Sequence, residues 1–306
     1  MDLRDDFRPA ILTTWQPSLS HILQRFPKMV MPAVEIYLHK PDLNVEWVIA
    51  AAQSGFTQQG LIVAFLSRLQ RKIKITSWYV VPECANHGLG QQLLTALEIW
   101  CRKQGIKHMT LDLRSGNLSY AVATHILQKQ GWSEHQPLVH RFKVAASTLK
   151  KLDWVRFQRK PTGIKAFPWK SLSDPQRKQL IEMWRDSSQF PGEVETVNIE
   201  RGIECAVSMG LCQEDRVVGW ILAHHVKRDL IEYSLLYVDP LQRSTGATIL
   251  LLGESFRRLA ETGAVNVIFQ VKVDNHLMLR FVHKRFQPIL SEATLYRSEK
   301  ALGIKA

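Results

Sequence analysis

The chain reads VVPECANHGLG at residues 80–90 and VDPLQRSTGAT at residues 238–248. The two stretches are 158 positions apart, and the same offset relates residues on both sides of them. The matched pairs are Tyr79 and Tyr237, Pro82 and Pro240, Gly88 and Gly246, Gly105 and Gly263, and Asn117 and Asn275. Self-similarity at a fixed distance indicates that one fold is repeated in tandem.

Each stretch lies between an expected strand and an expected helix. Residues 73–81 and 231–238 are rich in β-branched and aromatic residues, which favours strands. Apolar residues then recur at helical spacing and stop at a glycine typical of a helix C-terminus: Leu89, Leu93, Leu97 and Trp100 before Gly105, and Ile249, Leu252, Phe256 and Leu259 before Gly263. This order of strand, glycine loop, helix and strand predicts a phosphate site at the start of each helix.

The length and composition fit two globular domains. A chain of 306 residues predicts about two domains of the usual size. Hydrophobic periodicity lapses over residues 147–170, where Pro161, Gly163 and Pro168 interrupt the chain. We therefore expect one domain over residues 1–146 and a second over residues 147–306.

Several protein classes are disfavoured by the sequence. The N-terminus MDLRDDFRPA lacks the features of a secretory signal, and no apolar run is long enough to span a membrane. The four cysteines form no C-x-x-C pair, so neither a zinc site nor a disulfide scaffold is predicted. We expect a cytoplasmic protein without a bound metal.

The net charge of +12 predicts an anionic binding partner. Part of the excess falls in residues 68–74 and 150–170, where a solvated basic surface is one explanation and a nucleic-acid surface is another. No helix-turn-helix, zinc-finger or ribonucleoprotein signature supports nucleic-acid binding. A polyanionic cofactor or an acidic substrate explains the charge more simply.

At the two glycine loops the chain resembles the GCN5-related N-acetyltransferase (GNAT) superfamily. The acyl-CoA signature of that family is Arg/Gln-x-x-Gly-x-Gly/Ala, after a strand that ends near Val-x-Pro. Two such loops in one context extend the resemblance to nearly the whole chain. The resemblance implies an α/β (α+β) fold of two tandem domains, each with a mixed, mostly antiparallel sheet flanked by helices.

The resemblance also implies the residues that would bind an acyl-CoA. Glycine lets backbone N–H groups approach a pyrophosphate, and an arginine at the first motif position adds a charge-assisted bond. Arg243 fills that position in the second copy, whereas the first copy has Ala85. The expected cofactor residues are Tyr237, Val238, Arg243, Ser244, Thr245, Gly246, Ala247, Thr248 and Asn275 in the second copy, and Val80, Val81, His87, Gly88, Leu89, Gly90 and Asn117 in the first. The first loop could instead be an inherited turn that binds nothing, and Asn275 could be only a helix cap.

Acyl transfer to an amine requires a group that removes the amine proton. The resemblance places a carboxylate on the strand before the loop, where the second copy has Glu232 and the first has Lys74. A solvent-facing strand glutamate is the alternative explanation of Glu232. The family tyrosine that protonates the thiolate has no counterpart in either copy, and we expect His283 to replace it, unless His283 is an ordinary surface histidine.

These observations predict an acyl-CoA-dependent N-acyltransferase. Its second domain would transfer acetyl from acetyl-CoA to a primary amine on a small molecule, peptide or protein lysine. The first domain would be a degenerate copy that braces the second or shapes the acceptor groove. A non-catalytic acyl-CoA sensor or scaffold, and a nucleic-acid-binding protein, are the alternative classes. The acceptor and the oligomeric state stay open.

Overall fold

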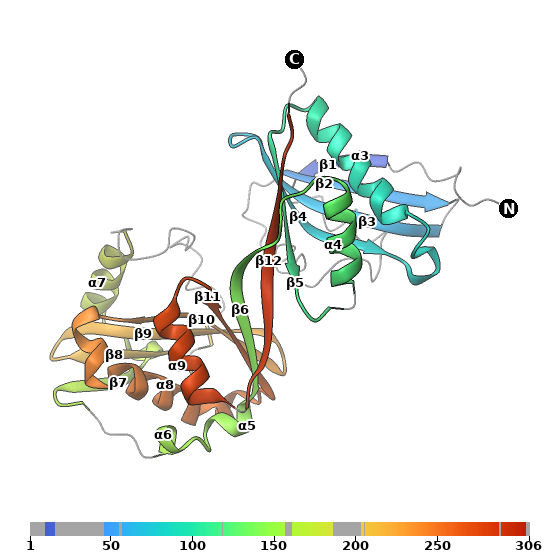
Figure 1. Ribbon diagram of the computed structural model, residues 1–306. Coiled ribbons are helices and arrows are strands. Elements are labelled where there is room, and N and C mark those ends of the chain that lie inside the picture. Colours follow the sequence, from blue (N-terminus) through green and yellow to red (C-terminus); the bar gives the residue numbers. More distant parts are fainter. Residues whose placement is uncertain are drawn as a thin grey trace. The chain divides into compact units, whose positions relative to one another are not determined.

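The chain divides into two compact units (Figure 1). The computed structural model describes residues 10–15, 46–54, 57–117, 119–156, 161–185, 203–204, 206–287 and 289–303. Unit 1 comprises Met1–Leu138 and Thr294–Ala306, and unit 2 comprises Val139–Ala293. The sequence placed the domain boundary after residue 146. The structure places it after Leu138 and assigns the C-terminal segment to unit 1.

The described part of unit 1 is a sheet with two α-helices on one face. Its strands lie in the order β1 (Ala10–Trp15), β2 (Glu46–Ser54), β3 (Thr57–Ser67), β4 (Lys72–Val80), β5 (His108–Arg114) and β12 (Ser291–Ala301). Only β4 and β5 are parallel. The helices α3 (Leu89–Lys103) and α4 (Tyr120–Lys129) bury Leu93, Leu97 and Leu127 against the sheet (Figure 1).

Unit 2 repeats this arrangement. Its strands lie in the order β6 (Gln136–Ala145), β11 (Asn266–Lys272), β10 (Leu230–Val238), β9 (Arg216–Lys227), β8 (Met209–Gln213) and β7 (Ile164–Pro168). Only β10 and β11 are parallel. The helices α8 (Ala247–Arg257) and α9 (His276–Phe286) cover one face, where Leu251, Phe256 and Phe286 are buried. The predicted mixed, mostly antiparallel sheets flanked by helices are confirmed.

The described residues of unit 2 form three further α-helices. The short helices α5 (Ala146–Leu149) and α6 (Asp153–Arg156) follow β6. The longer α7 (Asp174–Arg185) packs on the face of the sheet that α8 and α9 leave open, where Leu180 joins Trp220 and Tyr237 in a second apolar cluster. Both faces of the unit 2 sheet therefore carry buried side chains.

The last strand of each repeat lies in the sheet of the other unit. Strand β6 follows α4 in the chain but pairs with β11 of unit 2, with Asn266 opposite Ala145. Strand β12 follows α9 but pairs with β5 of unit 1, with Leu295 opposite Arg114. Neither unit can therefore be built from one continuous stretch of sequence. Simple hydrophobic periodicity did not reveal this exchange, because strand partners are set by long-range packing.

A buried ion pair attaches β12 to α3 within unit 1. The Lys300 Nζ donates to the Glu98 Oε2 at 2.6 Å, and the two side chains are only 12% and 6% exposed. Glu98 also accepts a bond from the Trp132 indole, and Lys300 also donates to the Gln130 carbonyl oxygen. These bonds compensate for the removal of both charges from water.

We predict that Lys300→Ala destabilises the protein by roughly 3 kcal/mol, because it leaves the buried Glu98 carboxylate without its closest cation. Urea denaturation followed by tryptophan fluorescence measures the change. Lys107→Ala is the control, since Lys107 is an exposed lysine of the same unit, and we expect it to shift the unfolding free energy by less than about 0.5 kcal/mol. Equal effects of the two substitutions would contradict a role of the buried pair in holding β12.

Candidate functional site

A β-bulge ends the parallel ladder in each unit at the same place. Residues Leu230–Tyr233 of β10 pair with Asn266–Phe269 of β11, and the pairing stops there although both strands continue. The next residue, Ser234, is the extra residue of a register shift against β9. Bulges bend a strand and increase its twist. The bend at Ser234 therefore explains why β10 separates from β11 toward their C-terminal ends.

Unit 1 shows the same break at positions offset by 158. The ladder between β4 and β5 stops at Ile75 and Leu111, and Thr76 is the extra residue against β3. The Thr76 hydroxyl donates to the Val63 carbonyl oxygen at 3.0 Å, and the Ser234 hydroxyl donates to the Leu222 carbonyl oxygen at 3.4 Å. Crevices at the carboxyl ends of separating parallel strands are the usual ligand sites of such sheets.

Each separating strand leads into a glycine loop that starts a helix. Gly88 and Gly246 have φ angles of +80° and +91°, and each is the N-cap of its helix without a side-chain cap bond. A Cβ atom at either glycine would meet no atom within 4 Å. The first N–H groups of a helix lack intrahelical partners and attract anions. Both loops therefore offer unpaired N–H groups to an anion, with open space beside each glycine.

The second loop also holds an arginine in place. The Arg243 Nε donates to the Val238 carbonyl oxygen at 2.9 Å, which orients the guanidinium at the end of β10. Asp239 accepts a bond from the Leu241 amide and is the cap residue of the turn. Ser244 and Thr245 are exposed, whereas Ala247 and Val238 are buried and Thr248 is half-buried.

The first loop has the glycines without the arginine. Ala85 takes the place of Arg243, and His87 is exposed. Leu89 is buried, Val80 and Val81 are half-buried, and a Cβ atom at Gly90 would lie 3.4 Å from the Trp78 indole nitrogen. This loop therefore offers main-chain groups to an anion but no cationic side chain at the motif position.

Glu232 lies at the point where β10 and β11 begin to separate. Its neighbours Ile231 and Tyr233 face the core under α8, so Glu232 points to the other face of the sheet. The Gln270 amide nitrogen donates to the Glu232 Oε1 at 3.0 Å. Gln270 follows Phe269, the last paired residue of β11, so the half-buried carboxylate reaches the start of the gap.

The equivalent positions of unit 1 carry an ion-pair network. Lys74 replaces Glu232, Asp112 replaces Gln270, and the Lys74 Nζ lies 2.9 Å from the Asp112 Oδ2. Arg297 of β12 donates to both Asp112 oxygens, at 2.8 and 3.1 Å. Burial alone would raise the pKa of Asp112, but Arg297 and Lys74 outweigh it and lower the pKa below the ordinary value. The base position of unit 1 therefore holds a paired cation.

Glu232 and His283 lie on opposite faces of the unit 2 sheet. His283 belongs to α9 and meets the ring of Phe142 edge-on, with ring centroids 5.8 Å apart, on the face that α8 and α9 cover. The structure therefore does not bring the two residues into direct contact.

The two asparagines have different local roles. The Asn275 side chain accepts a bond from the Met278 amide at 3.1 Å and caps α9, as the cap interpretation predicted. The Asn117 carbonyl oxygen accepts a bond from the Tyr120 amide at the start of α4, and the Asn117 side chain is exposed. Neither arrangement tests a contact with a cofactor.

Two tyrosines of β10 are largely buried. Tyr237 stacks on Trp220 with ring centroids 4.4 Å apart, and burial raises the pKa of Tyr237 above its usual value. Tyr233 lies under α8, where its hydroxyl bonds to the Ser255 hydroxyl at 2.7 Å, and full burial raises the pKa of Tyr233 strongly. Tyr233 and Trp220 are therefore core residues.

Strand β9 passes close to the main chain of Tyr237 at a glycine. A Cβ atom at Gly219 would lie 2.9 Å from the Tyr237 carbonyl oxygen, which is closer than real Cβ contacts. Any larger residue at position 219 would push β9 away from the C-terminal end of β10. Gly219 thus keeps the end of β10 in position before the second loop.

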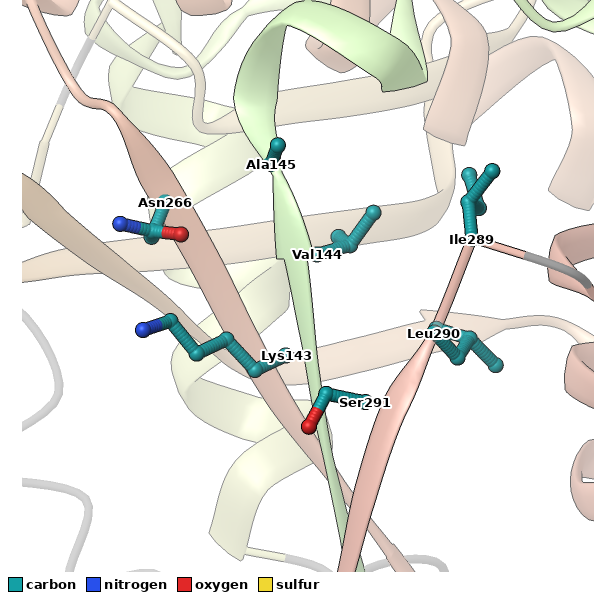
Figure 2. Close-up of a pocket in the computed structure, with 7 residues that line it drawn as sticks. All are labelled: Lys143, Val144, Ala145, Asn266, Ile289, Leu290 and Ser291. Atoms are coloured by element: carbon teal, nitrogen blue, oxygen red, sulfur yellow. The ribbon is translucent and has the colours of Figure 1, made fainter.

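A shallow pocket of about 370 Å³ lies away from these residues (Figure 2). Its lining includes Lys143, Asn266, Ile289 and Ser291, and Figure 2 shows Lys143 and Asn266 extending to the same side of β6. Asn266 is the first residue of β11, whereas the gap opens after Phe269. The pocket therefore contains none of the candidate site residues.

The described residues contain no group of three His, Cys, Asp or Glu that could hold a metal ion. His225 lies 2.9 Å from a Glu204 carboxylate oxygen. Cys84, Cys101 and Cys212 are free, and Cys205 lies outside the described residues. No helix in the described part of the chain is long and apolar enough to cross a membrane. A cytoplasmic location stays a prediction.

Comparison with known proteins identifies the fold. The sequence profile of the acetyltransferase (GNAT) family matches residues 14–131. A tandem GNAT protein from the clavulanic acid biosynthesis pathway shares the fold at a TM-score of 0.70 with 13% identity, over 97% of this chain and 99% of that chain. The family match falls in the first repeat, and nearly the whole chain has the fold of a tandem GNAT protein. No curated protein sequence matches it.

Other solved structures show the same GNAT fold. A GCN5-related N-acetyltransferase from Sphaerobacter thermophilus has a TM-score of 0.62 and 16% identity, over 97% of this chain and 96% of that chain. A fungal glucosamine N-acetyltransferase region has a TM-score of 0.64 and 15% identity, over 95% of this chain and 38% of that chain. The GNAT family is an acetyltransferase family that uses acetyl-CoA, which supports acyl-CoA-dependent chemistry in general terms.

Sequence reasoning missed two residues beside Glu232. Gln270 contacts Glu232, and Arg141 of β6 lies directly opposite Gln270 of β11. The offset of 158 could have identified Gln270 as the partner of Asp112 in the first copy. Nothing local could have identified Arg141, because it reaches unit 2 through the exchanged strand β6.

We predict that Asp112→Asn destabilises unit 1 at neutral pH by roughly 1–3 kcal/mol, because Lys74 and Arg297 lose their shared carboxylate. Because the pKa of Asp112 is lowered from 3.8, its carboxylate stabilises the protein fully at pH values above 3.8. This stabilisation is lost as the pH falls through the lower pKa that Asp112 has in the folded protein. The difference in urea midpoint between the variant and the parent should therefore narrow below pH 3.8. Glu134→Gln, at an exposed position, should show no such dependence.

Proposed function

We propose that unit 2 transfers an acyl group, most simply acetyl, from an acyl-CoA to a primary amine. The observation that carries the proposal is the position of Glu232 at the mouth of the gap that leads to the second glycine loop. The GNAT family match and the tandem GNAT fold support the reaction class.

The phosphate end of the cofactor would lie at the second loop. Gly246 allows close approach of the backbone, and the start of α8 supplies partial positive charge. Arg243 would add a charge-assisted bond from its remaining guanidinium N–H groups, since its Nε is bonded to the main chain. Ser244, Thr245, Ala247 and Thr248 would line this loop.

The acyl end would lie in the gap beyond Ser234. The edge of β10 that faces β11 has no ladder partner after Tyr233. A main-chain N–H near Tyr237 or Val238 would polarise the acyl carbonyl there. Acyl-CoA, when bound, supplies an activated thioester.

Glu232 would act as the general base of the transfer. It would remove a proton from the amine nitrogen, which forms the new C–N bond as the C–S bond breaks. His283 would donate a proton to the departing sulfur from the α9 side of the sheet, while Glu232 acts from the other side. The gap between β10 and β11 makes this division between two faces possible.

Unit 1 would serve as a structural partner. Lys74 cannot act as the base while it is paired with Asp112, and Ala85 removes the phosphate arginine. The first loop still has Gly88 and Gly90, so unit 1 could bind a CoA without turnover. Titration of variants at each loop distinguishes this from binding at unit 2.

We predict that acetyl-CoA binds once, at unit 2. Isothermal titration calorimetry of Gly246→Trp should show lost binding, because the bulky side chain fills the open space at the start of α8. Gly88→Trp is the matched control, since both glycines have positive φ angles and open space, and it should retain binding. Loss only with Gly88→Trp would reverse the roles of the units, and no binding to the parent protein would refute the transferase proposal.

We predict that Glu232→Gln lowers kcat by roughly 10²–10⁴-fold while acetyl-CoA affinity stays unchanged, because the amide cannot accept the amine proton. A thiol-release assay with amine acceptors measures the rate. Glu261→Gln, an exposed glutamate of unit 2, should match the parent. Acetyl-CoA binding with no turnover of any amine by the parent would favour the sensor alternative.

A further inference from the structure

The exchanged strand β6 brings two cations to the face of Glu232. Phe142 and Val144 of β6 are buried in the core under α8 and α9. Side chains alternate along a strand, so Arg141 and Lys143 point to the opposite face. That is the face on which Glu232 and Gln270 meet.

Arg141 and Arg297 occupy equivalent places in the two units. Arg297 of β12 lies opposite Asp112 of β5, and its guanidinium binds both carboxylate oxygens. Arg141 of β6 lies opposite Gln270 of β11. Each unit therefore has an arginine at this position, beside a carboxylate in unit 1 and beside a neutral amide in unit 2.

The side chain of the half-buried Arg141 makes no hydrogen bond or ion pair with any residue that the structure describes. The Gln270 amide nitrogen is bonded to Glu232. Lys143 and Lys272 lie on the same face of the sheet as Arg141 and Glu232. A planar carboxylate would match the fork of the guanidinium, as the Asp112 carboxylate does for Arg297.

We propose that the acceptor of unit 2 is a small molecule that carries both a primary amine and a carboxylate. Arg141 binds the carboxylate in the position that an aspartate fills in unit 1, and the amine lies toward Glu232. This inference rests on the proposed transferase function of unit 2. It also explains why the first repeat is retained, because the strand that follows its last helix supplies the acceptor subsite.

The test compares matched acceptors by binding and by turnover. With the protein saturated in CoA, calorimetric titration of β-alanine and γ-aminobutyrate is compared with titration of their carboxamides. Turnover with acetyl-CoA is measured for the same compounds. We expect the carboxylates to have at least a roughly tenfold advantage in Kd and in kcat/KM over the amides, which is about 1.4 kcal/mol.

Arg141→Gln should remove this advantage and leave the values for the carboxamides unchanged. Arg228→Gln is the control, because Arg228 is an exposed arginine in the turn between β9 and β10, at the other end of the strand from the gap. We expect this variant to retain the preference in full. If Arg141 served folding alone, Arg141→Gln would weaken binding and lower kcat/KM for the carboxylates and the carboxamides together.

Three results would overturn the inference. They are equal binding of carboxylates and amides, an unchanged preference in Arg141→Gln, and a stronger preference for phosphoethanolamine than for either carboxylate. Each leaves the transferase proposal intact if neutral amines are still acetylated. Failure of acetyl-CoA to bind would instead refute the transferase proposal itself.

Discussion

The separation of β10 from β11 is the constraint on which the candidate site depends. The ladder between β10 and β11 ends at Tyr233, and beyond the bulge at Ser234 the strand β10 pairs with β9. The same bend lies on the strand that leads into the loop of Gly246, so one local irregularity connects Glu232 to the second glycine loop. Its recurrence at Thr76 shows that both repeats use the same geometry.

The two repeats differ in charge where they agree in backbone. Lys74 and Asp112 form an ion pair in unit 1, whereas Glu232 accepts a bond from the neutral Gln270 in unit 2. A carboxylate bonded to an amide keeps its negative charge available to a ligand, while paired charges cancel each other. The GNAT family profile matches the first repeat, which has both loop glycines, whereas the arginine of the motif lies in the second repeat.

The exchange of β6 and β12 makes the repeats dependent on each other. Unit 1 needs Arg297 and Lys300, which belong to β12. The ion pair of Arg297 with Asp112 is partly shielded from water, and that of Lys300 with Glu98 is buried. Unit 2 contains Arg141, which the segment after α4 supplies. The second repeat therefore depends on the first, because loss of β6 would remove a strand of the unit 2 sheet.

The sequence by itself determined the tandem GNAT fold, the two glycine loops and the helices that follow them. These features depend on local chemistry, namely the positive φ angles of Gly88 and Gly246 and apolar residues at helical spacing. Only the tertiary structure decided the strand exchange, the boundary after Leu138 and the opposite faces of Glu232 and His283. Strand partners and the faces they expose result from contacts between distant segments, and a single sequence contains no local signal for them.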